Sequence, residues 1–168
     1  MKPDNAKIVS DISELNALFT NATNLKTLLQ NIVEMILSNM KADSCLLYLF
    51  DDNAQVLLLK ASKGPQEGSV DKVRLKPGEG FAGIAFKELR AVCEGNAVAI
   101  PIVRGSNRIG VIILQSVKKD HFSDEDVNIF CSIISPLVTT IEMAQQFVRR
   151  ILTHLRLPQP DSYIWTGE

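Results

Sequence analysis

Three glycines in the stretch KPGEGFAGIAF, namely Gly78, Gly80 and Gly83, form a GxGxxG pattern. This spacing is typical of the turn that holds the pyrophosphate of a dinucleotide, where the backbone must approach the ligand closely. A dinucleotide fold also needs a buried parallel strand directly before the first glycine. Residues 70–75 instead alternate apolar and charged side chains, and Pro77 follows them, which predicts a strand with one exposed face.

We therefore interpret these glycines as structural. Gly78 and Gly80 permit a tight turn, and Gly83 lets a short helix over residues 81–88 lie close to the sheet. A glycine-rich helix start can still receive an anion, so this interpretation leaves a charged ligand open.

Cysteine and histidine are the other residue types that could do chemistry here. Cys45, Cys93 and Cys131 lie far apart without a CxxC pair, and His121 and His154 lack a second ligand at metal spacing. No histidine has a readable nucleophile partner. We expect no metal, no cofactor and no enzymatic activity, and we expect the cysteines to act mainly as small buried hydrophobic residues.

The 168 residues suffice for one domain with a sizeable core. A net charge of −1 argues against a general nucleic-acid-binding protein, which would carry a basic face. The N-terminus lacks the apolar core of a signal peptide, and no apolar run approaches the ~20 residues of a membrane helix. We expect a cytoplasmic protein that binds neither nucleic acid nor membrane.

Two helices and two hairpins are predicted before the last helix. The first helix has an apolar face of Ile8, Ile12, Leu15 and Phe19, and the second covers residues 25–40. The segments CLLYLFDDNAQVLLLKAS and VAIPIVRGSNRIGVIIL each contain two apolar runs around a turn. Hairpins of this kind predict a mainly antiparallel sheet with helices packed against it, which is an α+β fold.

The last helix begins after Ser123 and has the most regular apolar spacing of the chain. Pro136 should kink or break it near Ser132. The spacing fits either a dimeric coiled coil or a single helix that faces the core, and the sequence leaves both open. The apolar positions, at steps of three and four, are Val127, Phe130, Ile134, Leu137, Ile141, Ala144, Val148, Ile151 and Leu155.

An ordered set of segments resembles the GAF domain of signalling proteins. The segments are LLQNIVEMILSNMKADSCLLYLFD, VRLKPGEGFAGIAF, AVAIPIVRGSNRIGVIILQ and FSDEDVNIFCSII. The chain is similar to the N-terminal GAF domains of bacterial nitrogen-regulatory proteins. The resemblance implies an antiparallel sheet with the terminal helices on one face and a pocket helix on the other. It also implies a small-molecule pocket, for which we predict Leu46, Tyr48, Phe81, Phe86 and Cys93.

The predicted organisation is an N-terminal signalling and dimerisation helix over residues 1–23, a GAF domain over 24–142, a helix extension over 143–157 and a tail or linker over 158–168. We expect a homodimer whose terminal helices pass the signal to an output domain in a longer chain. The predicted dimer contacts are Ile8, Ile12, Leu15, Phe19, Leu137, Ile141, Ala144, Val148, Ile151 and Leu155.

Three functions follow in order of preference. The first is a regulatory module that senses a small metabolite, and the second is an interaction module with a reduced pocket. The second is favoured by the short connection from Cys93 to Asn96, where GAF domains usually carry a longer segment over the ligand. This connection is either a true deletion or a place where a loop is absent from the sequence. The third function is a thiol-based reductase similar to free-methionine-sulfoxide reductases, acting through Cys93.

Overall fold

The computed structural model describes residues 25–40, 42–64, 67–118 and 122–154. A helix over residues 25–40 comes first. It is followed by β1 (Ser44–Asp51), β2 (Val56–Lys63), η1 (Glu67–Ser69), β3 (Arg74–Leu75), α2 (Gly80–Glu88), β4 (Val92–Glu94), β5 (Ala97–Arg104), β6 (Asn107–Gln115), α3 (Asp124–Ile134), η2 (Ser135–Leu137) and α4 (Val138–His154).

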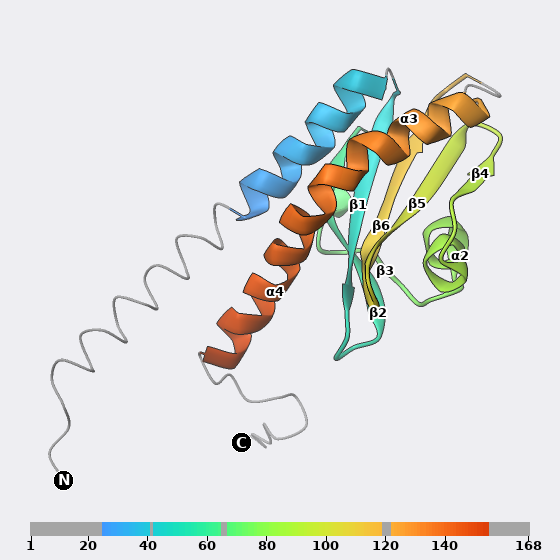
Figure 1. Cartoon of the computed structure of the whole chain (residues 1–168). Coiled ribbons are helices and arrows are strands. Elements are labelled where there is room, and N and C mark those ends of the chain that lie inside the picture. The colour runs from blue at the N-terminus through green and yellow to red at the C-terminus, as the bar shows by residue number, and fades with distance from the viewer. Residues whose placement is uncertain (1–24, 41, 65–66, 119–121, 155–168) are drawn as a thin grey trace, which may run out of the picture.

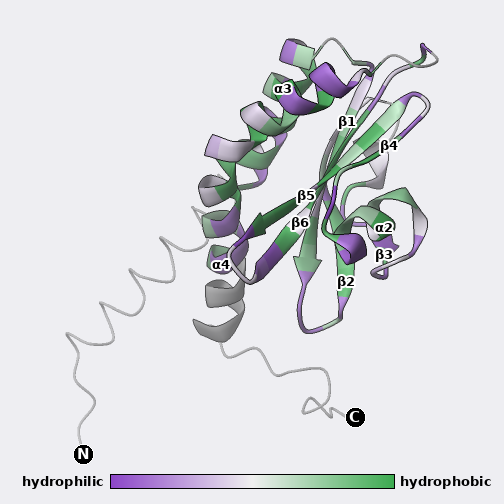
Figure 2. Ribbon diagram, turned by 45° about the vertical axis from the view of Figure 1, so that its right-hand side comes forward, coloured by the Kyte–Doolittle hydropathy of each residue, from purple (hydrophilic) through white to green (hydrophobic). Residues whose placement is uncertain are grey.

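The six strands form one antiparallel sheet in the order β3-β2-β1-β6-β5-β4. Both predicted hairpins are present, as β1–β2 and β5–β6, and β1 pairs with β6 at the centre of the sheet. The central strands are apolar on both faces because each face is covered by helices (Figure 2). The predicted α+β fold with an antiparallel sheet is confirmed.

Two apolar clusters lie on opposite faces of the sheet. The helix over residues 25–40 packs with α3 and α4 on one face, through buried residues such as Val33, Phe130 and Ile141. Helix α2 packs on the other face through Ala82, Ala85 and Phe86 (Figure 1). The predicted arrangement of terminal helices on one face and the pocket helix on the other is confirmed.

The strand predicted over residues 70–75 is shorter than expected. Only Arg74 and Leu75 pair with β2, because Asp71 turns the chain with φ +67° and donates its N–H to the Leu59 carbonyl at 2.7 Å. The alternation of charges in this segment therefore reflects a turn followed by a two-residue strand.

Helix α3 begins as predicted, with Ser123 at the N-cap. Its side chain accepts from the Asp126 N–H, and the Asp126 carboxylate accepts from the Ser123 N–H, which is a capping box. The helical run is interrupted by the 3₁₀ turn η2, which contains Pro136. The interruption lies three residues beyond the predicted position near Ser132, because the strain is relieved by a tighter turn at the proline itself.

The predicted dimer contacts near the start of α4 belong to the core of the single chain. Ile141 and Ala144 are buried in the cluster beneath the terminal helices, and Leu137 packs against it. Up to this point the regular apolar spacing therefore describes a helix that faces its own sheet. The side chains of Ile8, Ile12, Leu15, Phe19, Val148, Ile151 and Leu155 lie outside the described residues.

The helical run Asp124–Phe147 is long and apolar enough to cross a membrane, judged by length and composition alone. Its inner face is nevertheless the core of this domain, with Phe130, Ile134 and Ile141 packed on the sheet. Its outer face exposes Ile129 and Met143. The run also passes through the predicted boundary at residues 142–143 without a break, so the predicted extension continues α4.

Candidate functional site

The cluster between the sheet and α2 contains most of the predicted ligand-binding residues. Leu46, Tyr48 and Phe86 are among its buried members, and Phe81 packs against it while partly exposed. Leu46 and Tyr48 share one face of β1, because side chains alternate along a strand, while Cys45 and Leu47 face the opposite cluster. The structure thus brings four of the five predicted residues together.

Side chains fill the interior of this cluster. The exposed fraction is 0% for Phe86 and Leu57 and 2% for Leu46. Phe86 and Phe50 stack with ring centroids 4.6 Å apart. A ligand that enters between α2 and the sheet must therefore displace α2 or its side chains.

Tyr48 is the polar residue of the cluster interior. It is 5% exposed, and burial raises the pKa of its phenol because the charged form would lose hydration. Its hydroxyl forms no hydrogen bond with another described residue. The hydroxyl oxygen is not among the fully buried unpartnered atoms of the described residues, so it reaches the surface of the cluster, where a ligand could bind it.

Cys93 does not lie with the other predicted residues. On β4 the side chain of Val92 packs against the α2 cluster, and Cys93 is exposed. Cys93 lies opposite Val98, which belongs to the cluster on the other face. The short connection from Cys93 to Asn96 is thus the end of the edge strand β4 followed by a turn. The strand directs Cys93 away from the α2 cluster.

Arg108 is a residue at this site that the sequence analysis missed. Its guanidinium carbon lies 4.8 Å from the ring centroid of Phe86 and 5.7 Å from that of Phe50. Arg108 forms no ion pair or hydrogen bond through its side chain with another described residue. The rings of Phe50 and Phe86 therefore hold the Arg108 guanidinium at the rim of the cluster, and its N–H groups make no hydrogen bond to another described residue.

A strand irregularity explains why the sequence did not reveal Arg108. The pairing of β5 with β6 shifts after Ile102, which lies opposite Gly110, so that Val103 lies opposite Arg108. Ile109 then packs on the face of the terminal helices. Simple alternation from Val111 would have placed Arg108 on that face, and only the bulge turns it toward Phe86.

The glycine turn before α2 is structural in this fold. The Gly78 N–H donates to the Gly83 carbonyl at 2.8 Å, and a Cβ at Gly83 would lie 2.6 Å from the Lys76 carbonyl oxygen. Gly83 therefore allows close approach to the turn itself, and not to the sheet as predicted. Gly78 and Gly80 have φ of +88° and +68°. The strand before the turn, β3, is antiparallel to β2, which is not the arrangement of a dinucleotide fold.

The remaining cysteines differ in their surroundings, and only Cys45 is buried as the sequence predicted. Burial raises the pKa of the Cys45 thiol to about 12, because a thiolate there would be without water. Cys131 is exposed on α3. Within the ranges that the structure describes, no group of three or more histidine, cysteine, aspartate or glutamate residues could hold a metal ion.

Comparison with solved structures gives the same fold at low sequence identity. The GAF domain of a phosphoenolpyruvate-protein phosphotransferase from Acinetobacter is 21% identical with a TM-score of 0.65, covering 86% of this chain and 98% of that one. The second GAF domain of DevS from Mycobacterium smegmatis is 17% identical with a TM-score of 0.61, covering 75% and 99%. A type II free methionine-R-sulfoxide reductase from Thermoplasma acidophilum is 21% identical with a TM-score of 0.57, covering 71% and 96%.

No curated protein matches the chain significantly. The family model of the GAF domain matches residues 22–142, which is most of the chain. The match includes the sheet, the glycine turn and both apolar clusters except Ala144. The chain therefore belongs to the GAF domain family.

Proposed function

We propose that this GAF domain is a sensor that binds a small metabolite between α2 and the sheet and passes the signal through its terminal helices. The observation that carries the proposal is the pair of unused polar groups at one apolar cluster. Tyr48 is a buried member of the cluster and the Arg108 guanidinium lies over two of its aromatic rings, and the polar group of each has no side-chain partner among the described residues. Such a cluster suits a ligand with an apolar body and an acidic or hydroxyl group.

The β5–β6 hairpin supports a route from this cluster to α4. Arg108 follows Asn107, whose side chain donates to the Glu142 carboxylate of α4 at 2.8 Å. Arg104, on the other strand of the hairpin, donates to the same carboxylate at 2.9 Å. A ligand that moves Arg108 would thereby act on two contacts of the C-terminal helix.

The proposed assembly is a homodimer through the outer surface of the terminal helices. We define the outer stripe as the exposed apolar residues Leu28, Met35, Ile129 and Met143, which are 39–65% exposed. They are exposed residues of the helices that cover one face of the sheet (Figure 1). A second copy of the chain would bury this stripe, and the helices would connect the domain to an output domain in a longer cytoplasmic protein.

An interaction module without a ligand is the second candidate. The burial of Leu46, Leu57 and Phe86 favours this candidate, because side chains of the described residues surround all three and leave little room for a ligand. A reductase is the third. Similarity of fold to a free methionine-R-sulfoxide reductase supports it, but Cys93 lies apart from the cluster and Cys45 is buried. We therefore propose a regulatory and not an enzymatic role.

Native mass spectrometry of the purified protein tests the proposal. We expect a dimer that retains a small molecule, and we expect Arg108→Gln and Tyr48→Phe to lose it. Arg90→Gln is the matched control, since Arg90 is an exposed arginine paired with Glu88. A dimer that carries no added mass, and gains none from a metabolite extract, would replace the sensor by the interaction module.

A further inference from the structure

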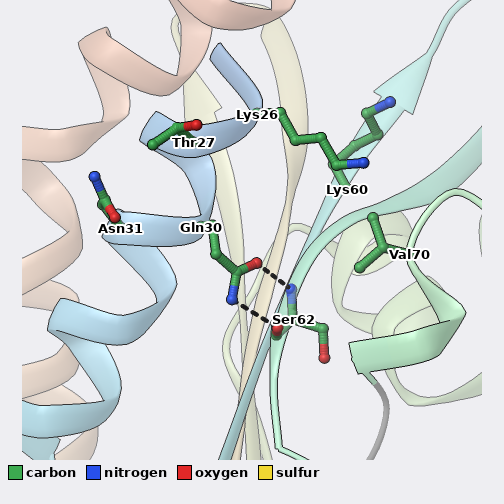
Figure 3. Close-up of a pocket in the computed structure, with 7 residues that line it drawn as sticks. All are labelled: Lys26, Thr27, Gln30, Asn31, Lys60, Ser62 and Val70. Carbon is green, nitrogen blue, oxygen red and sulfur yellow. Dashed lines mark hydrogen bonds between the residues drawn. The ribbon is translucent and has the colours of Figure 1, made fainter. Parts of the chain in front are cut away.

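A groove lies at the β2 side of the sheet, beside the helix over residues 25–40 (Figure 3). Its volume is about 430 Å³, within the range of small-molecule sites. It is separate from the α2 cluster, because none of its lining residues belongs to that cluster. The lining residues are Lys26, Thr27, Gln30, Asn31, Lys60, Ser62 and Val70.

The shortness of β3 creates this groove. The two residues of β3 pair only with Leu57 and Leu58, and the preceding turn then bonds to Leu59. From Lys60 onward no strand of the described residues pairs with β2 on this side. The pairing with β1 also shifts here, since Leu59 and Ala61 have partners on β1 and Lys60 has none. A bulge of this kind redirects a side chain, and here that side chain lines the groove.

Gln30 fixes the two walls of the groove relative to each other. Its side-chain Nε2 donates to the Ser62 carbonyl at 2.9 Å, and its Oε1 accepts from the Ser62 N–H at 3.4 Å (Figure 3). The same amide thus holds the helix to the strand through both of its polar atoms. The groove is therefore formed before any ligand binds, which lowers the entropy cost of binding.

The charge of the lining is positive. Lys26 and Lys60 are the charged residues among the seven, and no acidic residue lines the groove. Lys60 donates to Asp71 at 2.7 Å, so one charge is partly balanced at the edge. Lys26 forms no ion pair with another described residue.

Neutral hydrogen-bonding groups complete the lining. Thr27 and Asn31 present a hydroxyl and an amide from the helix. Ser62 carries a buried hydroxyl that has no partner among the described residues. Figure 3 draws this hydroxyl on the side of Ser62 away from Gln30, so the neutral side chains of the lining that could meet a ligand are those of Thr27 and Asn31.

We propose that this groove binds a small anion, through a carboxylate or phosphate group that pairs with Lys26 and Lys60. Both groups are recognised by lysine ammonium groups and by neutral donors such as Asn31. A bound anion would bridge the helix over residues 25–40 to β2 and strengthen the contact that Gln30 already makes.

Titration of the full chain, labelled with ¹⁵N and followed by NMR, tests the proposal with inorganic phosphate and with succinate. We expect at least one probe to give saturable shifts for the amides of residues 26–31 and 60–62. Lys26→Gln and Lys60→Gln should each weaken the binding by about tenfold, because each removes one charge-assisted hydrogen bond. Comparison of the two probes distinguishes a phosphate ligand from a carboxylate ligand.

Lys87→Gln is the matched control, since Lys87 lies on α2 across the sheet and should leave the affinity unchanged. The proposal is overturned if neither probe gives saturable shifts at these amides, or if Lys87→Gln weakens binding as much as the groove substitutions. Neither result would bear on the α2 cluster, which is tested by its own variants.

Discussion

Gly110 lies on β6 opposite Leu49 of β1. A Cβ at this position would overlap the carbonyl oxygen of Tyr48, and that carbonyl belongs to the central pair of strands. Gly110→Ala should therefore force the two strands apart and lower the free energy of unfolding by about 3 kcal/mol or more. Urea denaturation followed by circular dichroism measures this change.

Gly68→Ala is the control for this substitution. A Cβ at Gly68 would meet no atom within 4 Å, so its effect on the free energy of unfolding should be close to zero. Equal stability of the two variants would contradict the close approach of the strands at Gly110.

The sequence predicted some residues of the candidate site and missed others. Leu46 and Tyr48 could be predicted to share a face because strand alternation is regular through this part of β1. Arg108 was not predicted, since its orientation depends on a bulge beside Gly110, and a glycine in a strand is the one signal that could have indicated it. Cys93 was wrongly assigned to the pocket because its segment, interpreted as a loop, forms the edge strand β4. Side chains alternate between the two faces of a strand, and Cys93 is on the face away from the α2 cluster.

Helix α4 is joined to the β5–β6 hairpin by a buried carboxylate. Hydrogen bonding from Asn107, and then the hydrogen bond and positive charge of Arg104, lower the pKa of Glu142 below its ordinary value. In the unfolded chain this carboxylate has its ordinary pKa. Its contribution to stability is therefore complete above that ordinary pKa and is lost as the pH falls through the lowered one.

Glu142→Gln should consequently be less stable than the parent chain near neutral pH, and the difference should shrink under acidic conditions. Thermal unfolding between pH 7 and pH 3 measures it. Glu88→Gln is the comparison, because Glu88 forms an exposed pair with Arg90 that contributes little to stability. A difference that stays constant down to pH 3 would show that the Glu142 contacts do not depend on its charge.

Among the elements, the long apolar patterns were the most predictable. Both hairpins, the helix over residues 25–40 and the cap at Ser123 follow directly from spacing and turn residues. The segment before Gly78 was overestimated as a strand, because its alternation continues through a turn at Asp71. Periodicity alone does not show where hydrogen bonding begins.

The whole domain presents an apolar outer surface that its own sheet does not cover. Met143 is 65% exposed and Ile129 is 46% exposed, and both lie on the helical run that also forms the core. If a second copy covers this surface, the double substitution Ile129→Glu and Met143→Glu should convert a dimer into a monomer, since like charges would meet across the interface. Sedimentation velocity measures the mass.

Val117→Glu is the control for that experiment. Val117 is 82% exposed but lies in the segment after β6 and not on the helices that carry the outer stripe. It should leave the dimer intact. A parent chain that sediments as a monomer would contradict the proposed assembly and leave the outer stripe to another partner.

The hydrogen bonds of Gln30 also affect whether folded chains can pair through the exposed edge of the sheet. A strand edge with free N–H and C=O groups is a template on which another chain can add a strand and begin to aggregate. β3 and the Asp71 turn occupy the outer edge of β2 as far as Leu59, and the Gln30 amide occupies the backbone groups of Ser62. The Gln30 side chain therefore occupies backbone groups on the part of β2 that β3 leaves uncovered, and the helix that carries it protects this edge of the sheet from pairing with another chain.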